Sequence, residues 1–153
     1  MSPADGFRPP QRVRPLAICV FRRPDGHVLV VPGYDEVKDQ RFYRPLGGEI
    51  EFMETAEAAA RRELLEEIGA EVAEMRLLGT FENLFTYRGT SGHELVWVFE
   101  GTFVDPSLYE REAIACNEGE ANFEAHWVPM DVFTRGSAPL YPDGLMDLLT
   151  QRI

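Results

Sequence analysis

The chain has 153 residues, 44% of them apolar, and its 15 basic and 26 acidic side chains give a net charge of −11. This length suits one domain with a substantial core, which we expect over residues 12–153, behind a polar, Pro-rich and mobile arm of residues 1–11. The acidic balance argues against extended nucleic acid as a partner, because such proteins need a basic surface. No apolar run approaches the roughly 18 residues of a membrane span, and no secretory signal is recognisable. We therefore expect a cytoplasmic protein.

The first part of the chain predicts two strands. Val13 to Phe21 is an apolar, β-branched run typical of a central strand, and Val28 to Val31 is a second, shorter run. The sequence Pro24-Asp25-Gly26 between them favours a turn, so we expect a hairpin. Pro32 to Arg41 is predicted to be a polar loop.

A Gly-rich turn, Gly47-Gly48, leads into a helix that we predict from Ala56 to Ile68. This segment has high helix propensity, since it holds no Gly or Pro and no β-branched residue before its last position. Thr55 is expected to cap its first turn, and Gly69 to end it in the left-handed conformation. The positions expected to face a core are Leu64, Leu65 and Ile68.

Three acids share another face of this helix. Glu63, Glu66 and Glu67 are spaced i, i+3 and i+4, so their side chains project together. Two carboxylates about 6 Å apart repel by about 3 kcal/mol at an effective dielectric of about 20. A solvated surface and a bound divalent cation each account for such a cluster, because Mg²⁺ takes carboxylate oxygens as ligands.

The second half of the chain predicts mainly strands. Val72 to Tyr87 suits one long or two short strands, and His93 to Val104 is the clearest strand in the sequence. We expect these segments to form a long antiparallel hairpin. Asp105 to Glu124 is a polar, acidic connection, and His126 to Val128 is a short strand.

A helical turn at Asp131 and an amphipathic helix from Asp143 to Arg152 close the chain. Strands interleaved with a central and a terminal helix predict an α+β fold with a mixed sheet between helices. Cys19 and Cys116 do not suggest a disulfide or a metal site, and we expect two ordinary reduced thiols.

The whole acidic segment follows one spacing pattern. Its specified residues are Gly48, Glu54, Arg62-Glu63-Leu64, Glu66-Glu67 and Gly69-Ala70. This pattern resembles the Nudix box, G-x5-E-x7-R-E-U-x-E-E-x-G-U with U an apolar residue, and all nine specified positions match over 23 residues. The resemblance implies a Nudix hydrolase with an α/β/α sandwich fold. Such enzymes cleave a nucleoside diphosphate linked to another group, using Mg²⁺ or Mn²⁺.

The resemblance also implies roles for single residues. The metal ligands would be Glu63, Glu66, Glu67 and the backbone carbonyl of Gly47. Arg62 resembles the arginine that orients a box glutamate, and Glu54 the glutamate that braces the loop after Gly48. Many family members carry Gly where this chain has Met53, so the loop geometry is expected to differ there.

The general base is less closely defined by the resemblance. In some family members it is a box glutamate, and in others it lies on a later loop, which corresponds here to Asn117 to Ala125. Glu120 is the first candidate on this loop and Glu118 the second. Each is equally well explained as a solvated loop acid.

Substrate contacts are expected around the glycine turn. Arg44 is the best placed phosphate ligand, because it directly precedes the turn. Weaker phosphate candidates are Arg41, Lys38 and Arg22. The aromatic candidates for stacking on a base are Tyr34, Phe42, Phe85 and Tyr87, and His93 is a further candidate for the cleft.

Two other functions remain open from sequence. One is a non-catalytic nucleotide sensor on the same fold, although a sensor need not keep every acid of the box. The other is an isomerase of an isoprenoid diphosphate, whose chemistry requires an active-site thiol. The expected partner is a small nucleotide, and a homodimer is compatible with the sequence.

Overall fold

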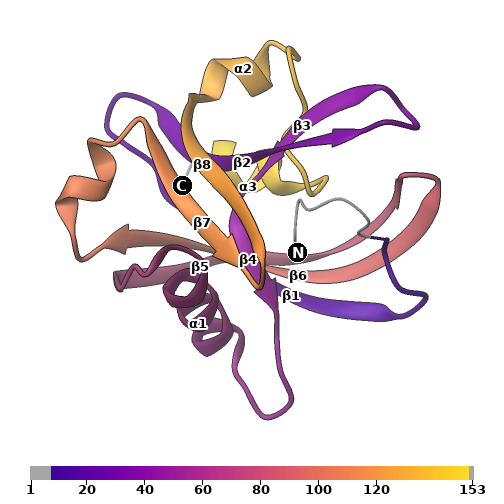
Figure 1. Cartoon of the computed structure of the whole chain (residues 1–153), viewed down its shortest axis with the longest axis horizontal. Coiled ribbons are helices and arrows are strands. Elements are labelled where there is room, and N and C mark those ends of the chain that lie inside the picture. Colours follow the sequence, from indigo (N-terminus) through magenta and orange to yellow (C-terminus); the bar gives the residue numbers. More distant parts are fainter. Residues whose placement is uncertain (1–7, 152–153) are drawn as a thin grey trace.

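The computed structural model describes residues 8–151, which form two four-stranded sheets and three α-helices (Figure 1). The first sheet has the order β4 (Leu46–Glu49), β1 (Val13–Val20), β6 (Thr90–Phe103) and β5 (Val72–Tyr87). It is mixed, because β1 runs parallel to β6 while the other pairs are antiparallel. The second sheet is antiparallel and has the order β3 (Gln40–Arg44), β2 (His27–Asp35), β8 (Ala121–Pro129) and β7 (Ala113–Glu118). The helices are α1 (Ala56–Ile68), α2 (Met130–Thr134) and α3 (Leu145–Thr150), and Pro106–Tyr109 forms a 3-10 turn.

Strand β1 lies between two cores. Its side chains alternate, so that Cys19 packs in one core and Ile18 in the other. The first core is closed by α1 through Leu64, and the second by α2 and α3 through Phe133 and Leu145. Figure 1 shows α1 at the bottom of the molecule and α2 at the top. The predicted α+β sandwich with a mixed sheet between helices is therefore confirmed.

The predicted hairpin of the first two strands is wrong. The turn forms, with the Arg23 amide donating to the His27 carbonyl at 2.8 Å, but only an isolated bridge joins Arg22 to Val28. Strand β1 instead pairs with β4 and β6, and β2 pairs with β3 and β8. A run that is buried on both faces needs a partner strand on each side, and these partners come from distant parts of the chain.

Three predicted loops contain further strands. Residues 32–35 continue β2, and β3 begins at Gln40, because the Asp35 carboxylate accepts the amides of Val37 and Lys38 and makes a tight turn. The Gly47-Gly48 turn is strand β4, paired with Ile18 and Ala17 of β1. The polar connection after residue 105 contains β7, whose alternate side chains Ile114 and Cys116 are buried. Cys116 therefore lies in a strand, and both thiols are buried and free.

The other elements follow the sequence closely. Val72–Tyr87 is one long strand with two bulges, and it pairs with β6 along almost its whole length. The short helix at Asp131 and the terminal helix are confirmed, although residues 152–153 lie outside the described part. Residues 1–7 also lie outside it, so only the end of the expected arm is described. No helix among residues 8–151 is long and apolar enough to cross a membrane.

Helix α1 has its predicted bounds and caps. The Thr55 hydroxyl accepts the Ala58 amide at 3.1 Å, and Gly69 ends the helix with φ 65°. One expectation for its faces is wrong, since Leu65 is 56% exposed while Glu67 is only 3% exposed. Strand β7 packs against the face that carries Glu67. The burial of an acid in place of a leucine is the first structural sign that this face has a function.

Candidate metal and phosphate site

Arg62 joins the loop after β4 to the acidic face of α1. Its guanidinium donates to Glu54 at 2.8 and 2.9 Å, to Glu63 at 2.9 Å and to Glu66 at 3.4 Å. It also donates to the backbone carbonyl of Glu49 at 3.0 Å. These bonds hold the pKa of Glu54 down at about 2. The brace that the sequence predicted for Arg62 and Glu54 is therefore present in the geometry.

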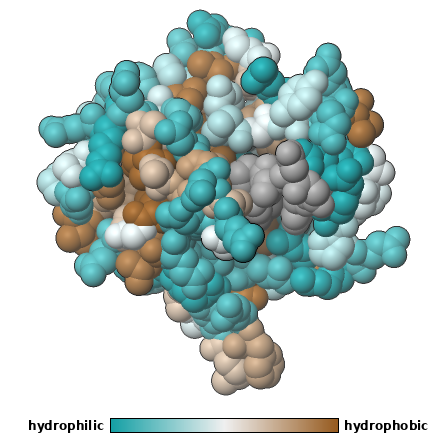
Figure 2. Space-filling view, in the orientation of Figure 1, coloured by the Kyte–Doolittle hydropathy of each residue, from teal (hydrophilic) through white to brown (hydrophobic). Residues whose placement is uncertain are grey.

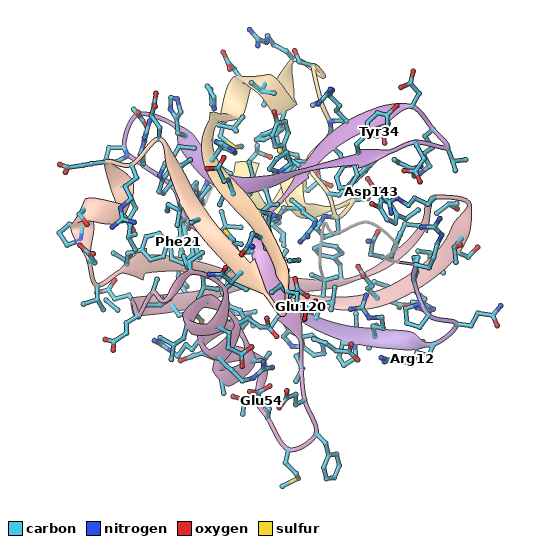
Figure 3. All side chains as sticks on the ribbon, viewed as in Figure 1. Arg12, Phe21, Tyr34, Glu54, Glu120 and Asp143 are labelled. Atoms are coloured by element: carbon cyan, nitrogen blue, oxygen red, sulfur yellow. The ribbon has the colours of Figure 1, made fainter. Side chains whose placement is uncertain are left out.

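The loop itself projects from the body of the molecule. Glu54 accepts the Glu51 amide at 3.0 Å, which closes the loop beside α1 (Figure 3). Its tip carries two exposed apolar side chains, Phe52 and Met53. Figure 2 shows a hydrophobic knob at the bottom of the molecule, where the loop between β4 and α1 lies in Figure 1. Met53 has φ 67°, a left-handed conformation that favours glycine.

The two glycines of β4 leave space for other groups. A Cβ on Gly48 would lie 2.3 Å from Cδ of Glu63, so the carboxyl group of Glu63 occupies the place of a side chain. A Cβ on Gly47 would lie 2.3 Å from the Ala17 carbonyl oxygen, and Gly47 has φ 150°. Both positions therefore require glycine, which brings the helix acid and the strand backbone together.

Glu67 is a buried acid with an unpartnered oxygen. Its Oε1 atom has no hydrogen-bond partner among the described residues. Burial, together with a hydrogen bond to Glu63, raises the pKa of Glu67 to about 8, while the charge of Arg44 opposes the shift. A carboxyl group in this state is suited to a cation or a substrate that is absent from the chain itself.

Arg44 is a buried guanidinium that interacts electrostatically with Glu67. Its side chain is 5% exposed, and its Nη2 atom also has no hydrogen-bond partner among residues 8–151. Burial lowers the pKa of the Arg44 guanidinium, while the carboxylates of Glu67 and Glu118 oppose the shift. A buried guanidinium with an unused donor is a ready ligand for a phosphate oxygen.

The two candidate bases differ in their surroundings. Glu118 is half-buried at the end of β7, and its buried Oε2 atom has no hydrogen-bond partner in the described part of the chain. Glu120 is exposed in the turn between β7 and β8, as Figure 3 shows. The carboxylate of Glu118 interacts electrostatically with Arg44.

The acids do not yet form a metal centre. Among residues 8–151, no three His, Cys, Asp or Glu side chains are gathered so that they could hold a metal ion. The positive charge beside Glu63 and Glu66 is the guanidinium of Arg62. The donor set still fits a hard cation, because it combines carboxylate oxygens with a glycine backbone at which no Cβ intrudes. Glu66 is exposed, so its side chain can change rotamer at little cost.

The weaker phosphate candidates lie apart from this site. Arg22 is bonded to Glu100 and to the Leu149 carbonyl. Arg41 is exposed and stacks over Tyr34. Lys38 donates to the Thr86 carbonyl at 2.7 Å, and both residues line a cavity that also includes Arg44. The hydroxyl of Tyr34 donates to Asp39, and the ring of His93 faces Glu82. Neither side chain is therefore directed to the acidic face of α1.

A cavity opens beside Arg44, between β3, β5, β6 and residues 141–143. Three of the predicted stacking residues line it, namely Phe42, Phe85 and Tyr87. Two polar residues that the sequence did not single out, Asn83 and Glu94, also line it. Side chains in a strand point alternately to its two faces, and Asn83 and Glu94 each occupy a position on the inward face of their strand. A polar residue at such a position is the signal that could have revealed them.

Comparison with known proteins identifies a family and a shared fold. A family model described as the NUDIX domain matches residues 12–147. The chain is similar in structure to a NUDIX hydrolase from Nitrosomonas europaea, with a TM-score of 0.63 and 20% identity, over 90% of this chain and 86% of that one. It also resembles the MutT protein from Methanosarcina mazei Go1, with a TM-score of 0.57 and 16% identity, over 92% and 91% of the two chains. It is also similar to the MutT protein from Bacillus halodurans, with a TM-score of 0.58 and 17% identity, over 89% of this chain and 80% of that one.

At these identities the structural likeness establishes the fold, while the family match spans most of the chain. The chain therefore belongs to the NUDIX domain family of hydrolases, which act on pyrophosphate bonds.

Proposed function

We propose that the protein is a metal-dependent nucleotide pyrophosphohydrolase, which cleaves the pyrophosphate bond of a nucleoside diphosphate linked to another group. One observation carries this proposal. Glu67 and Arg44 are both buried and interact electrostatically, yet each keeps a buried polar atom without a partner among the described residues. A cation on the acid and a phosphate on the guanidinium would satisfy both atoms.

The metal ligands in this proposal are Glu63, Glu66, Glu67 and the backbone carbonyl of Gly47. Mg²⁺ or Mn²⁺ held there would neutralise the diphosphate oxygens and lower the pKa of a bound water. Arg62 positions these acids, because it ties Glu63 and Glu66 to the loop through Glu54. Gly48 provides the space in which the carboxyl group of Glu63 lies.

The remaining roles fall to residues around Arg44. The Arg44 guanidinium donates to a phosphate oxygen and stabilises the charge that builds up there as the bond breaks. Glu118 accepts a proton from the attacking water. We place it ahead of Glu120 because its carboxylate is half-buried and interacts with Arg44, whereas Glu120 is exposed.

Two alternative functions receive less support. A nucleotide sensor would not need Glu63, Glu66 and Glu67 together with their arginine. An isoprenoid diphosphate isomerase would need a reactive thiol, but Cys19 and Cys116 are both buried. Burial raises the pKa of Cys116 to about 11 and that of Cys19 still further, so neither forms a thiolate readily.

A nucleotide panel tests the proposal. The full chain is incubated with nucleoside di- and triphosphates, nucleotide sugars and dinucleoside polyphosphates, with Mg²⁺, Mn²⁺ or EDTA, and released phosphate and pyrophosphate are measured. We expect hydrolysis of a small nucleotide that requires the metal. Tight nucleotide binding without any hydrolysis would instead support the sensor. The same proposal includes a small-molecule substrate and a cytoplasmic location. It also includes action without extended nucleic acid.

A further inference from the structure

The cavity beside Arg44 has room for a single flat ring system. Its volume is about 130 Å³, and a cavity of about 150 Å³ is known to hold one benzene ring. The space is therefore of the size that one aromatic ring of a nucleotide base takes up. Arg44 lines the same cavity and also interacts electrostatically with Glu67, so a base in the cavity and a diphosphate at the acids can belong to one molecule.

Two aromatic rings of the cavity are seated on glycines. A Cβ on Gly33 would lie 2.4 Å from Cζ of Phe42, and a Cβ on Gly92 would lie 2.3 Å from Cζ of Phe85. Each ring therefore lies directly on the backbone of the neighbouring strand. This packing fixes both rings as walls of the cavity, and such rings can stack on a base of any kind.

A row of three buried polar residues crosses the sheet at the cavity. Asn83 of β5 is paired with Glu94 of β6, and Glu94 is paired with Arg14 of β1. The Asn83 amide nitrogen donates to Oε1 of Glu94 at 3.4 Å, and Arg14 donates to Oε2 of Glu94 at 3.3 Å. All three side chains are at least nine-tenths buried.

This row decides which atom Asn83 offers to a ligand. Because its amide nitrogen is bonded to Glu94, its carbonyl oxygen Oδ1 is the atom left for other contacts, and no donor among the described residues is bonded to it. The reverse orientation of the Asn83 amide would place its carbonyl oxygen against Oε1 of Glu94, while Oε2 of Glu94 accepts from Arg14. The row therefore presents a hydrogen-bond acceptor to the cavity.

We propose that the cavity binds the base of the substrate, and that Asn83 selects a base with an exocyclic amino group. The inference rests on the proposed nucleotide hydrolysis and names the substrate class of that site. An amino group can donate to Asn83 Oδ1, whereas a ring carbonyl at the same position would place its oxygen against the oxygens of Asn83 and Glu94. The site thus favours a nucleotide with an amino base over its keto counterpart.

Two substrate pairs isolate this contact. Cytidine and uridine triphosphates differ by an amino group against a carbonyl at one ring position, and adenosine and inosine triphosphates differ in the same way. We expect kcat/KM to favour the amino member of at least one pair by about tenfold to a hundredfold, the usual effect of leaving a buried polar group unpaired. Equilibrium affinities measured by calorimetry in EDTA should show the same order.

Two variants test the residues. In Asn83→Leu the amino-to-keto ratio should fall to near one. In Glu94→Gln the ratio should also fall, because the new amide can donate to Asn83 Oδ1. Glu100→Gln is the matched control, since Glu100 lies on the same strand and is paired with Arg22 and Arg76, outside the cavity. It should leave the ratio unchanged, and thermal melts identify any variant that fails to fold.

The outcomes separate the inference from the proposed function. Hydrolysis with equal kcat/KM in both pairs overturns the selection by Asn83 and leaves the hydrolase proposal intact. An amino preference that persists in Asn83→Leu also overturns it. If no nucleotide is hydrolysed, the proposed function fails, and the affinities in EDTA decide the inference, with equal affinities contradicting it.

Discussion

The carboxyl group of Glu63 lies where a side chain on Gly48 would be, because a Cβ built there comes within 2.3 Å of Cδ of Glu63. Gly48 is not among the glycines with positive φ. Its requirement for glycine is therefore one of space and not of backbone conformation. The contact joins the strand that carries the predicted carbonyl ligand to the helix that carries the predicted carboxylate ligands.

Gly48→Ala should displace Glu63 and lower kcat/KM by about 10²-fold, which is the cost of misplacing a catalytic group by about 1 Å. Nucleotide hydrolysis with Mg²⁺ measures this. The matched control is Gly26→Ala, at a turn with φ 87° where a Cβ would meet no atom within 4 Å. The control should lose about 1 kcal/mol of stability from backbone strain and keep its activity. Full activity of Gly48→Ala would show that the position of Glu63 does not matter.

Local signals in the sequence were enough for helix α1 and its loop. Thr55, Gly69 and the uninterrupted helix formers between them fix the helix by interactions within a few residues, and Arg62 reaches Glu54 and Glu66 over similarly short separations. The acidic spacing left a solvated surface and a bound cation both open, and the resemblance of the whole segment to the Nudix box implied the metal site.

The hairpin of β5 and β6 was predicted from sequence, but the pairing of strands that are distant in the chain was beyond such signals. The partners of β1 are β4 and β6, whose paired residues lie about 30 and 80 positions away, and an apolar run does not specify which strand it will meet. The exposure of Leu65 and the burial of Glu67 also depend on a distant element, since β7 packs against α1. For the same reason, the alternation that places Asn83 and Glu94 on inward positions did not indicate a function until β5 and β6 were placed beside Arg44.

Glu118→Gln should lower kcat more than Glu120→Gln, by about 10²-fold for a lost general base. The physical reason is the position of Glu118, half-buried and coupled to Arg44, whereas Glu120 is exposed. Glu124→Gln, an exposed acid on β8, is the control and should retain full activity. The opposite order of the first two variants would assign the base to Glu120.

The stability of the metal-free protein should fall as pH rises from about 4.5 to 8. Glu67 has a pKa of about 8 in the folded protein against an ordinary value of 4.5, so the folded chain keeps a proton that the unfolded chain releases. Chemical denaturation in EDTA at several pH values measures this slope, and Glu67→Gln should make it shallower. Parallel slopes in the two proteins would contradict the raised pKa.

Met53→Gly should stabilise the protein by about 1 kcal/mol, the cost of a side chain in the left-handed region. Met53 is 88% exposed, so little packing is lost. The neighbouring Phe52→Gly is the control, because Phe52 is also exposed but is not among the residues with positive φ. It should gain nothing and lose up to about 1 kcal/mol. Thermal melts compare the two, and equal effects would mean that the strain at Met53 is absent.

The most direct test of the central claim is the rate of nucleotide hydrolysis with Mg²⁺ in the wild type and in Glu67→Gln. The variant should retain its fold by circular dichroism and lose about 10³-fold in kcat, because a metal ligand that supplies several kcal/mol is removed. Glu71→Gln, just beyond the helix and exposed, is the matched control and should hydrolyse at the wild-type rate. Undiminished turnover in Glu67→Gln would contradict the assignment of α1 as the metal-binding helix.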